Sequence, residues 1–258
     1  MAILFDMDLR AARRDRAKRS GPELFLLDRA FEDCLDRLSL IRQRFQYALL
    51  VGCPDPRWRT RLLDFTDAID VRDPGLLFSH AADGEPVIED QWEPDQGQYD
   101  IVLAIGTLDT VNDLQRALFA MRLGLKTDGF LIGAMSGGNT LPRLRSAMRA
   151  ADAVMGEASP HVHPRVEAAA LAPLLEQAGF ANPVVDIDRI AVNYGSFAKL
   201  VADLRRMGST NILSERSRRP LSRQALASAA GDFASGSHEG RTAEVFEILH
   251  FAGWAKKL

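Results

Sequence analysis

The stretch LLVGCPDPRW, residues 49–58, decides the fold, because an apolar run ends abruptly in Gly52-Cys53. In nucleotide-binding α/β folds the first strand ends in such a glycine turn, where backbone N–H groups and the next helix's positive end meet the ligand. Pro54 and Pro56 stand where further glycines are expected. Proline fixes φ and lacks an N–H donor. The loop is therefore predicted to have lost part of its capacity to hold a cofactor.

The composition is that of an ordinary globular protein. The 258 residues are 47% hydrophobic and 26% charged, and the net charge of -3 gives no reason to expect nucleic acid as a partner. The cysteines, Cys34 and Cys53, form no disulfide framework or zinc motif, which favours a reducing compartment. No apolar run approaches the ~20 residues of a membrane span. We predict a cytoplasmic protein, or a mitochondrial matrix protein if the source is eukaryotic.

Strands and helices alternate along the first half of the chain. Apolar runs at 47–52, 66–71, 99–106 and 129–135 read as buried parallel strands, with a weaker edge strand at 86–90, and helical patterns lie between them. Further helices and strands at 182–193 and 242–257 follow. This order predicts a doubly wound α/β sheet with an antiparallel final strand and inserted lid helices. We expect one domain over 1–258: N-terminal helices at 1–40, a cofactor-type half at 41–135, and a substrate-side half at 136–258.

The first segment, residues 1–20, is basic but carries Asp6, Asp8 and Asp15. Acidic residues are scarce in transit peptides. We interpret this segment as a solvated helix of the mature protein.

The cofactor half offers polar groups where its strands end. An acidic residue after the second strand can accept hydrogen bonds from ribose hydroxyls, and we predict Asp70 rather than Asp67 or Asp73 for this role. Such an acid can also be simple turn chemistry. The predicted cofactor-binding residues are Gly52, Cys53, Asp70, Glu89, Asp90, Gly106 and Asp109.

The substrate half offers a second group of candidates. Gly138, Asn139 and Thr140 follow the strand at 129–135, where open α/β sheets bind ligands, although they also suit a helix N-cap. Arg145 can bind a carboxylate or simply lie in solvent. His161 and Tyr194 complete the predicted substrate-binding set. His161 and His163 lack a converging third ligand, so we predict no metal site.

The chain resembles the complex I assembly factor 5 type of class I methyltransferase-fold protein, the arginine-hydroxylase family. The resemblance rests on motifs in order along nearly the whole chain: FDMDLR (5–10), VNDLQRAL (111–118), LKTDGFLIGAMSGGNTLPRLR (125–145), SPHVHP (159–164), VDIDRIAVNYGSFAKLVADLRRMGSTN (185–211) and GWAKK (253–257). Arg145 matches the family-like TL--LR pattern. The usual G-C-G-x-G loop is G-C-P-D-P here.

This resemblance implies S-adenosylmethionine as cofactor and a role in respiratory complex I assembly. The implied partner is a protein substrate, with an arginine of a complex I peripheral-arm subunit as the candidate group. The altered loop keeps two alternatives open. One is a noncatalytic assembly factor with a degenerate cofactor site, and the other is a methyltransferase acting on small molecules or carrier proteins.

Overall fold

The computed structural model describes residues 3–256. Its strands form one mixed sheet in the order β3-β2-β1-β4-β5-β8-β6, in which β8 runs antiparallel to β5 and β6. The strands are β1 (Phe45–Val51), β2 (Thr66–Asp73), β3 (Glu85–Pro86), β4 (Tyr99–Ile105), β5 (Leu125–Ser136), β6 (Phe180–Tyr194), β7 (Ser237–His238) and β8 (Arg241–Ala255). This is the predicted doubly wound α/β fold with an antiparallel final strand.

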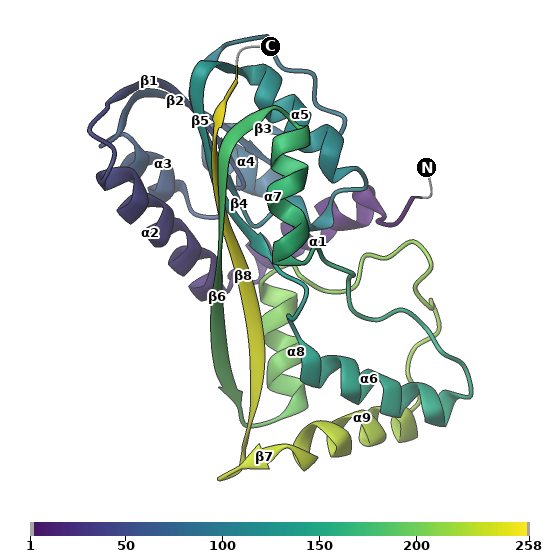
Figure 1. The fold of residues 1–258 in the computed structure, drawn as a ribbon. Helices are drawn as coiled ribbons and strands as arrows, with labels where there is room; N and C mark the ends of the chain where they lie inside the picture. Colours follow the sequence, from purple (N-terminus) through teal and green to yellow (C-terminus); the bar gives the residue numbers. More distant parts are fainter. Residues whose placement is uncertain (1–2, 257–258) are drawn as a thin grey trace.

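Helices cover both faces of the sheet (Figure 1). The described helices are α1 (Met7–Arg19), α2 (Phe25–Ser39), α3 (Pro56–Leu62), α4 (Leu76–Ala81), α5 (Leu114–Gly124), α6 (Pro142–Met155), α7 (Ala168–Gln177), α8 (Phe197–Arg206) and α9 (Arg223–Ser235), with a 3₁₀ turn at Leu108–Thr110. On one face α2 buries Phe31, Leu35 and Leu38, whose spacing places them on one side of the helix. On the other face, α5 and α7 bury Leu118 and Leu171. Each such side chain contributes about 1.5–3 kcal/mol.

The long strands β6 and β8 extend beyond the rest of the sheet. Their antiparallel register runs from Phe180 opposite Ala255 to Tyr194 opposite Thr242. Helices α6, α8 and α9 pack beside the lower part of this strand pair (Figure 1). They share an apolar cluster that includes Leu200 and Phe233. The predicted inserted helices therefore form a layer past the carboxyl ends of the parallel strands.

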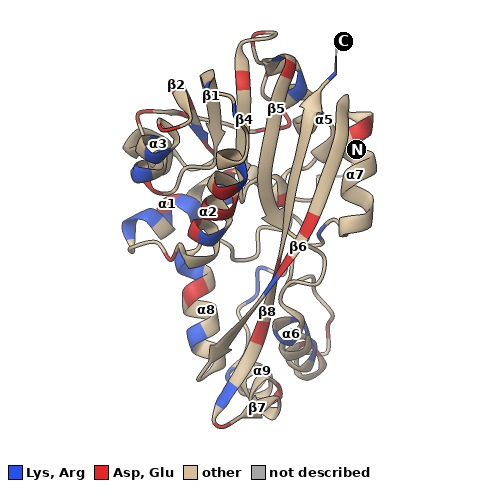
Figure 2. Ribbon diagram, turned by 60° about the vertical axis from the view of Figure 1, so that its left-hand side comes forward, with Lys and Arg blue, Asp and Glu red and all other residues tan. Residues whose placement is uncertain are grey.

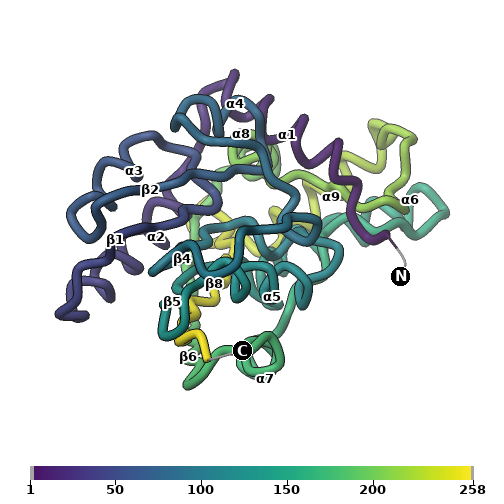
Figure 3. Tube along the Cα trace, turned by 90° about the horizontal axis from the view of Figure 1, so that it is seen from above, coloured from purple at the N-terminus to yellow at the C-terminus, as the bar shows by residue number. Residues whose placement is uncertain are grey.

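Helix α1 is not the solvated helix that the sequence suggested. It lies beside α4 and α8 (Figure 3). Arg10, Arg14 and Ala17 are buried in this contact. The prediction was wrong because an Arg-rich pattern gives no sign of buried carboxylate partners.

Two strand predictions need adjustment. The strand expected at 86–90 is only the short β3, and Glu89 and Asp90 lie in the turn after it. The closing strand was predicted to reach Lys257, which lies outside the described residues, and β8 ends at Ala255. The other predicted strands and helices are confirmed to within a few residues, but β2 continues to Asp73, and the short elements α4 and β7 were not predicted.

Candidate functional site

The turns after β1, β2, β4 and β5 meet at one edge of the sheet, which we call the carboxyl rim (residues 52–53, 73–75, 106–109 and 137–140). Gly52 adopts φ +84°, and a Cβ there would lie 2.2 Å from the carbonyl oxygen of Ile105. Gly106 adopts φ +65°, and its Cβ would lie 2.4 Å from Leu27 Cδ2. At Gly52 only glycine suits both the backbone conformation and the space, and at Gly106 the positive φ itself favours glycine. These turns are tightly packed against the chain itself.

The prolines of the first loop have a structural role. Asp55 is the N-cap of α3, and its side chain accepts a hydrogen bond from the Arg57 N–H. Pro56 occupies the first turn of α3, where the missing donor costs nothing to the helix. Cys53 is buried, and this burial raises the pKa of its thiol to about 12. The loop therefore offers one buried, protonated thiol and a helix start that lacks a donor.

The acid at the end of β2 is Asp73, and the choice of Asp70 for that place was wrong. Asp70 lies inside the strand and accepts a hydrogen bond from the Tyr99 hydroxyl at 2.8 Å. Asp73 is fully buried. Its carboxylate accepts from Arg14 Nε at 2.9 Å, Arg14 Nη2 at 2.6 Å, Cys53 N at 3.0 Å and Gly75 N at 2.7 Å. A carboxylate has about four acceptor sites, so those of Asp73 are all used.

A second arginine of α1 binds the acid beyond β3. Arg10 donates to both carboxylate oxygens of Glu89, at 2.7 and 2.9 Å, and to the Thr107 carbonyl oxygen at 2.6 Å. Glu89 is 1% exposed and Arg10 is 4% exposed. Burial disfavours the charge on Arg10, but Glu89, with the charges of Asp109 and Asp73, outweighs it and raises the pKa of the guanidinium. The neighbouring Asp90 accepts instead from the backbone N–H groups of 112 and 113.

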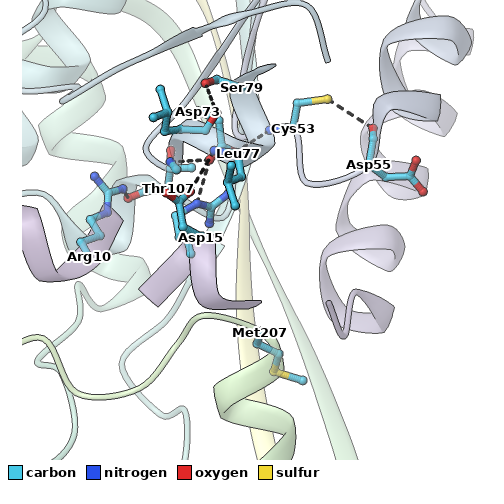
Figure 4. Close-up of polar contacts among 12 residues, drawn as sticks. Arg10, Asp15, Cys53, Asp55, Asp73, Leu77, Ser79, Thr107 and Met207 are labelled. Carbon is cyan, nitrogen blue, oxygen red and sulfur yellow. Dashed lines mark hydrogen bonds and ion pairs between the residues drawn. The ribbon is translucent and has the colours of Figure 1, made fainter. Parts of the chain in front are cut away.

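The two ion pairs lie side by side along α1. Figure 4 shows Arg10 directed at Thr107, and Asp73 bonded to the turn that contains Cys53. Blue bands mark the arginines and lysine of α1 in Figure 2. Bidentate geometry makes such pairs strong and directional. Both carboxylates that could hold a nucleoside therefore hold guanidinium groups of the same chain.

This geometry does not fit S-adenosylmethionine. A ribose needs free acceptors on the acid after β2, and Asp73 has none while Arg14 is bound. The cavity at the rim, which we call the rim cavity, has a volume of about 100 Å³. Sites for ligands of drug size are usually ~300–1,000 Å³. With α1 docked, the acceptors of Asp73 are not available to the cofactor.

The rim cavity has apolar walls and a few charged groups. Its lining includes Leu27, Gly106, Thr140, Glu247 and Ile248. Asp109 also lines it and forms an ion pair with Arg165. Of the predicted cofactor residues, Gly106 and Asp109 reach this cavity.

A larger cavity lies between α6, α8 and the loops at 161–165 and 209–211, and we call it the substrate-side cleft. Its volume is about 400 Å³. Leu144, Met148, Phe197 and Val201 supply apolar walls. It shares Leu141, Arg165, Leu204 and Ser209 with the rim cavity. The two cavities are therefore neighbours along one path from the surface to the rim.

The predicted substrate residues after β5 hold the turn together. The Asn139 side chain and backbone N–H both donate to Glu247, each at 3.4 Å. The Thr140 hydroxyl donates to the Glu247 carbonyl oxygen at 3.0 Å. A Cβ at Gly138 would lie 2.1 Å from the Glu167 carboxylate. Only Thr140 of these three lines the rim cavity.

The loop at 161–165 brings two histidines to the cleft. His161 Nε2 lies 2.7 Å from Asp152 Oδ1, and its ring lines the cleft. His163 is buried, and its Nε2 accepts from the Ile212 N–H at 3.0 Å. Burial, followed by the charge of Arg165, lowers the pKa of His163 to about 4. Arg145 braces this loop through a 3.3 Å bond to the His163 carbonyl oxygen.

Tyr194 lies apart from the other candidates. It lines a separate cavity of about 410 Å³ at the end of β6, beside Lys199 and Arg241. Among the described residues its buried hydroxyl has no hydrogen-bond partner. The structure does not bring Tyr194 to the rim.

Sequence reasoning missed Arg10, Arg14, Arg165 and Glu247. The sequence around a single arginine or glutamate does not show whether its side chain is buried, so only the fold could reveal Arg10, Arg14, Arg165 and Glu247.

Within residues 3–256, no helix is long and apolar enough to span a bilayer. No three His, Cys, Asp or Glu side chains of the same residues converge as a metal site.

Comparison with known proteins shows which solved structures share the fold of this chain. No protein-family model matches it. Two solved Bacillus structures share the fold: the YcgJ protein of Bacillus subtilis (TM-score 0.60, 10% identity, 88% of this chain and 99% of that chain) and a putative methyltransferase of Bacillus halodurans (TM-score 0.61, 10% identity, 88% and 100%). At 11% identity and a TM-score of 0.54, a Haemonchus contortus phosphoethanolamine N-methyltransferase in complex with S-adenosyl-L-methionine also matches, over 88% of this chain and 52% of that chain.

The curated relatives are more similar in sequence. The mouse protein named arginine-hydroxylase NDUFAF5, mitochondrial, is 31% identical, covering 97% of this chain and 77% of the relative. The human protein of the same name is also 31% identical, covering 97% and 76%. A putative methyltransferase of Rickettsia prowazekii is 29% identical, covering 58% and 68%. The chain thus belongs to the family of the mitochondrial arginine-hydroxylase NDUFAF5.

Proposed function

We propose that the chain acts in the assembly of respiratory complex I by binding an arginine-bearing segment of a peripheral-arm subunit. The relatives named arginine-hydroxylase support arginine as the target group. The path formed by the substrate-side cleft and the rim cavity supplies a place for such a segment. In this proposal the cleft receives apolar side chains, and the rim cavity receives the arginine.

The observation that carries this proposal is that Glu247 has a buried carboxylate whose only cationic partner among the described residues, Arg189, is mostly exposed. Its carboxylate is 1% exposed and lines the rim cavity. Its cationic partner Arg189 has a side chain that is 61% exposed and binds through Nε alone, at 2.9 Å. A substrate guanidinium could replace Arg189 with a bidentate contact, and bidentate pairing is stronger and more selective for arginine. The walls formed by Leu26, Leu27 and Ile248 would cover its methylene groups.

The predicted contacts Asn139, Thr140, Arg145 and His161 keep their place in this proposal. The first two orient Glu247 or line its cavity, and the last two shape or line the cleft. Cofactor binding at Gly52 and its neighbours is no part of the docked state, because Arg14 then holds the carboxylate of Asp73.

The closed rim favours a second candidate, a noncatalytic assembly factor that holds the subunit without modifying it. A strain that lacks the gene separates the two. Native gels report complex I assembly, and mass spectrometry of the peripheral-arm subunits reports arginine modification. If the strain loses both complex I assembly and an arginine modification, the chain is an enzyme. If it loses assembly while every arginine modification remains, the chain is a noncatalytic factor. Normal assembly in this strain contradicts both.

Peptide binding tests the recognition site itself. Arginine peptides that tile the peripheral-arm subunits should bind more tightly than the same peptides with lysine. Glu247→Gln should weaken this binding by about tenfold or more, because a charge-assisted pair contributes ~1.5–3 kcal/mol. Glu239→Gln, on the exposed tip next to β7, is the matched control. Equal loss in both variants would reject Glu247 as the guanidinium site.

A further inference from the structure

We propose that α1 is a latch over the part of the carboxyl rim around Gly52 and Asp73 and the neighbouring Glu89, which we call the nucleoside end. Arg10 and Arg14 occupy the carboxylates of Glu89 and Asp73, and a nucleoside ligand can bind there only after α1 has moved away. Docking of α1 and binding of the ligand are then mutually exclusive.

The first argument is the number of acceptors. Asp73 receives four hydrogen bonds, and two of them come from Arg14. The other two come from rim backbone, at Cys53 and Gly75, and hold the carboxylate in place whether or not α1 is present. Release of Arg14 would therefore free two acceptor positions on a carboxylate that is already oriented. Two adjacent ribose hydroxyls require such a pair of acceptors.

The second argument is the nature of the α1 contact. The buried side chains of the helix are Arg10, Arg14 and Ala17. Its further contacts include a hydrogen bond from the Leu77 N–H to Asp15 and the packing of Arg14 and Lys18 over the Phe78 ring. Burial of an ion pair costs much of the attraction that it provides. When α1 leaves, both arginines and both carboxylates regain water. Docking of a helix through desolvated ion pairs therefore contributes less net free energy than the strength of each pair suggests.

The third argument is that both flanks of α1 are anchored independently of the rim. Before the helix, Phe5 packs with Ile212 and Leu213, and its backbone exchanges two hydrogen bonds with the Asn112 side chain. After the helix, the Gly21 carbonyl oxygen accepts from Arg206 Nε at 2.8 Å. These anchors keep the segment beside the rim after Arg10 and Arg14 have been released, so release requires α1 to unwind or shift between them, and the helix can dock again.

The test uses the full-length chain with Arg10→Gln and Arg14→Gln combined. Arg16→Gln with Arg19→Gln is the control, because it removes the same charge from exposed positions of the same helix. Amide hydrogen exchange over residues 7–19 reports docking of α1, and calorimetry reports binding of S-adenosylhomocysteine. We expect fast exchange and measurable binding in the first variant. Wild type and control should show protected α1 amides and binding weaker by at least about tenfold.

Reciprocity supplies a second readout. If docking and binding exclude each other, saturating S-adenosylhomocysteine must accelerate exchange in α1 of the wild type. Phe5→Ala loosens one anchor and leaves all four charged groups intact, so it replaces the double variant if that variant does not fold. Three results would overturn the proposal. The α1 amides could stay protected in the Arg10→Gln/Arg14→Gln and Phe5→Ala variants, or α1 could exchange fast in them without any gain in ligand binding. The third is that ligand binding slows exchange in α1 of the wild type.

Discussion

The nucleoside end of the rim and the substrate-side cleft lie on the same edge of the sheet, but they are filled differently. At the nucleoside end, buried arginines of α1 bind buried carboxylates, and the turns leave no room for a Cβ at Gly52. The cleft, by contrast, is an open space of about 400 Å³ with apolar walls. In this chain ion pairs close the nucleoside end, while the substrate-side cleft remains open. Access to the two carboxylates therefore depends on α1, whereas the cleft has no α1 residue in its lining.

The largest effect is expected from Gly52→Ala at the closed end. The substitution places Cβ 2.2 Å from a backbone oxygen at φ +84°. Strain and overpacking together should lower the free energy of unfolding by about 2–5 kcal/mol, measured with urea. Gly240→Ala is the control, since it has φ +75° but open space around it. A loss at Gly52 no larger than that at Gly240 would mean that the rim is less tightly packed than described.

A pH effect of intermediate size is expected from His163, beside the cleft. Its pKa in the folded chain is about 4, below the ordinary 6.5, so the folded state disfavours the proton. Stability from this group is full above pH 6.5 and falls as the pH drops toward 4. Between pH 7 and pH 5 the free energy of unfolding should fall by about 2 kcal/mol.

Urea unfolding at both pH values checks this expectation. His163→Asn should remove most of the difference between the two pH values, whereas His80→Asn, at an exposed position, should retain it. An unchanged pH dependence in His163→Asn would show that other groups cause it.

The smallest effect on stability is expected in the open cleft. Leu226 is 50% exposed and lines the cleft, so Leu226→Gln should change the free energy of unfolding by only about 0.5 kcal/mol or less. The same change should reduce recovery of complex I assembly in a strain that lacks the gene, because a partner contact becomes polar. Leu40→Gln, at a remote and 82% exposed position, should leave both properties unchanged. Full recovery with Leu226→Gln would argue against the cleft as the partner site.

The sequence predicted the fold far better than the site. Apolar runs such as 99–106 are local signals, and they placed the strands because a strand covered on both faces must be apolar. The end of β2 was placed too early because Asp70 follows an apolar pair, while the strand continues to Asp73. The pairing of Arg10 with Glu89 joins positions 79 apart in the chain. No local sequence pattern encodes such a contact, and the basic sequence of α1 by itself predicts a helix exposed to solvent.

A crystal structure of the full chain grown with saturating S-adenosylhomocysteine tests the central claim most directly. The account predicts that Asp73 binds either the Arg14 guanidinium or ribose hydroxyls, with α1 displaced in the second case. A nucleoside bound beside Gly52 and Asp73 while Arg14 still holds both carboxylate oxygens would contradict it.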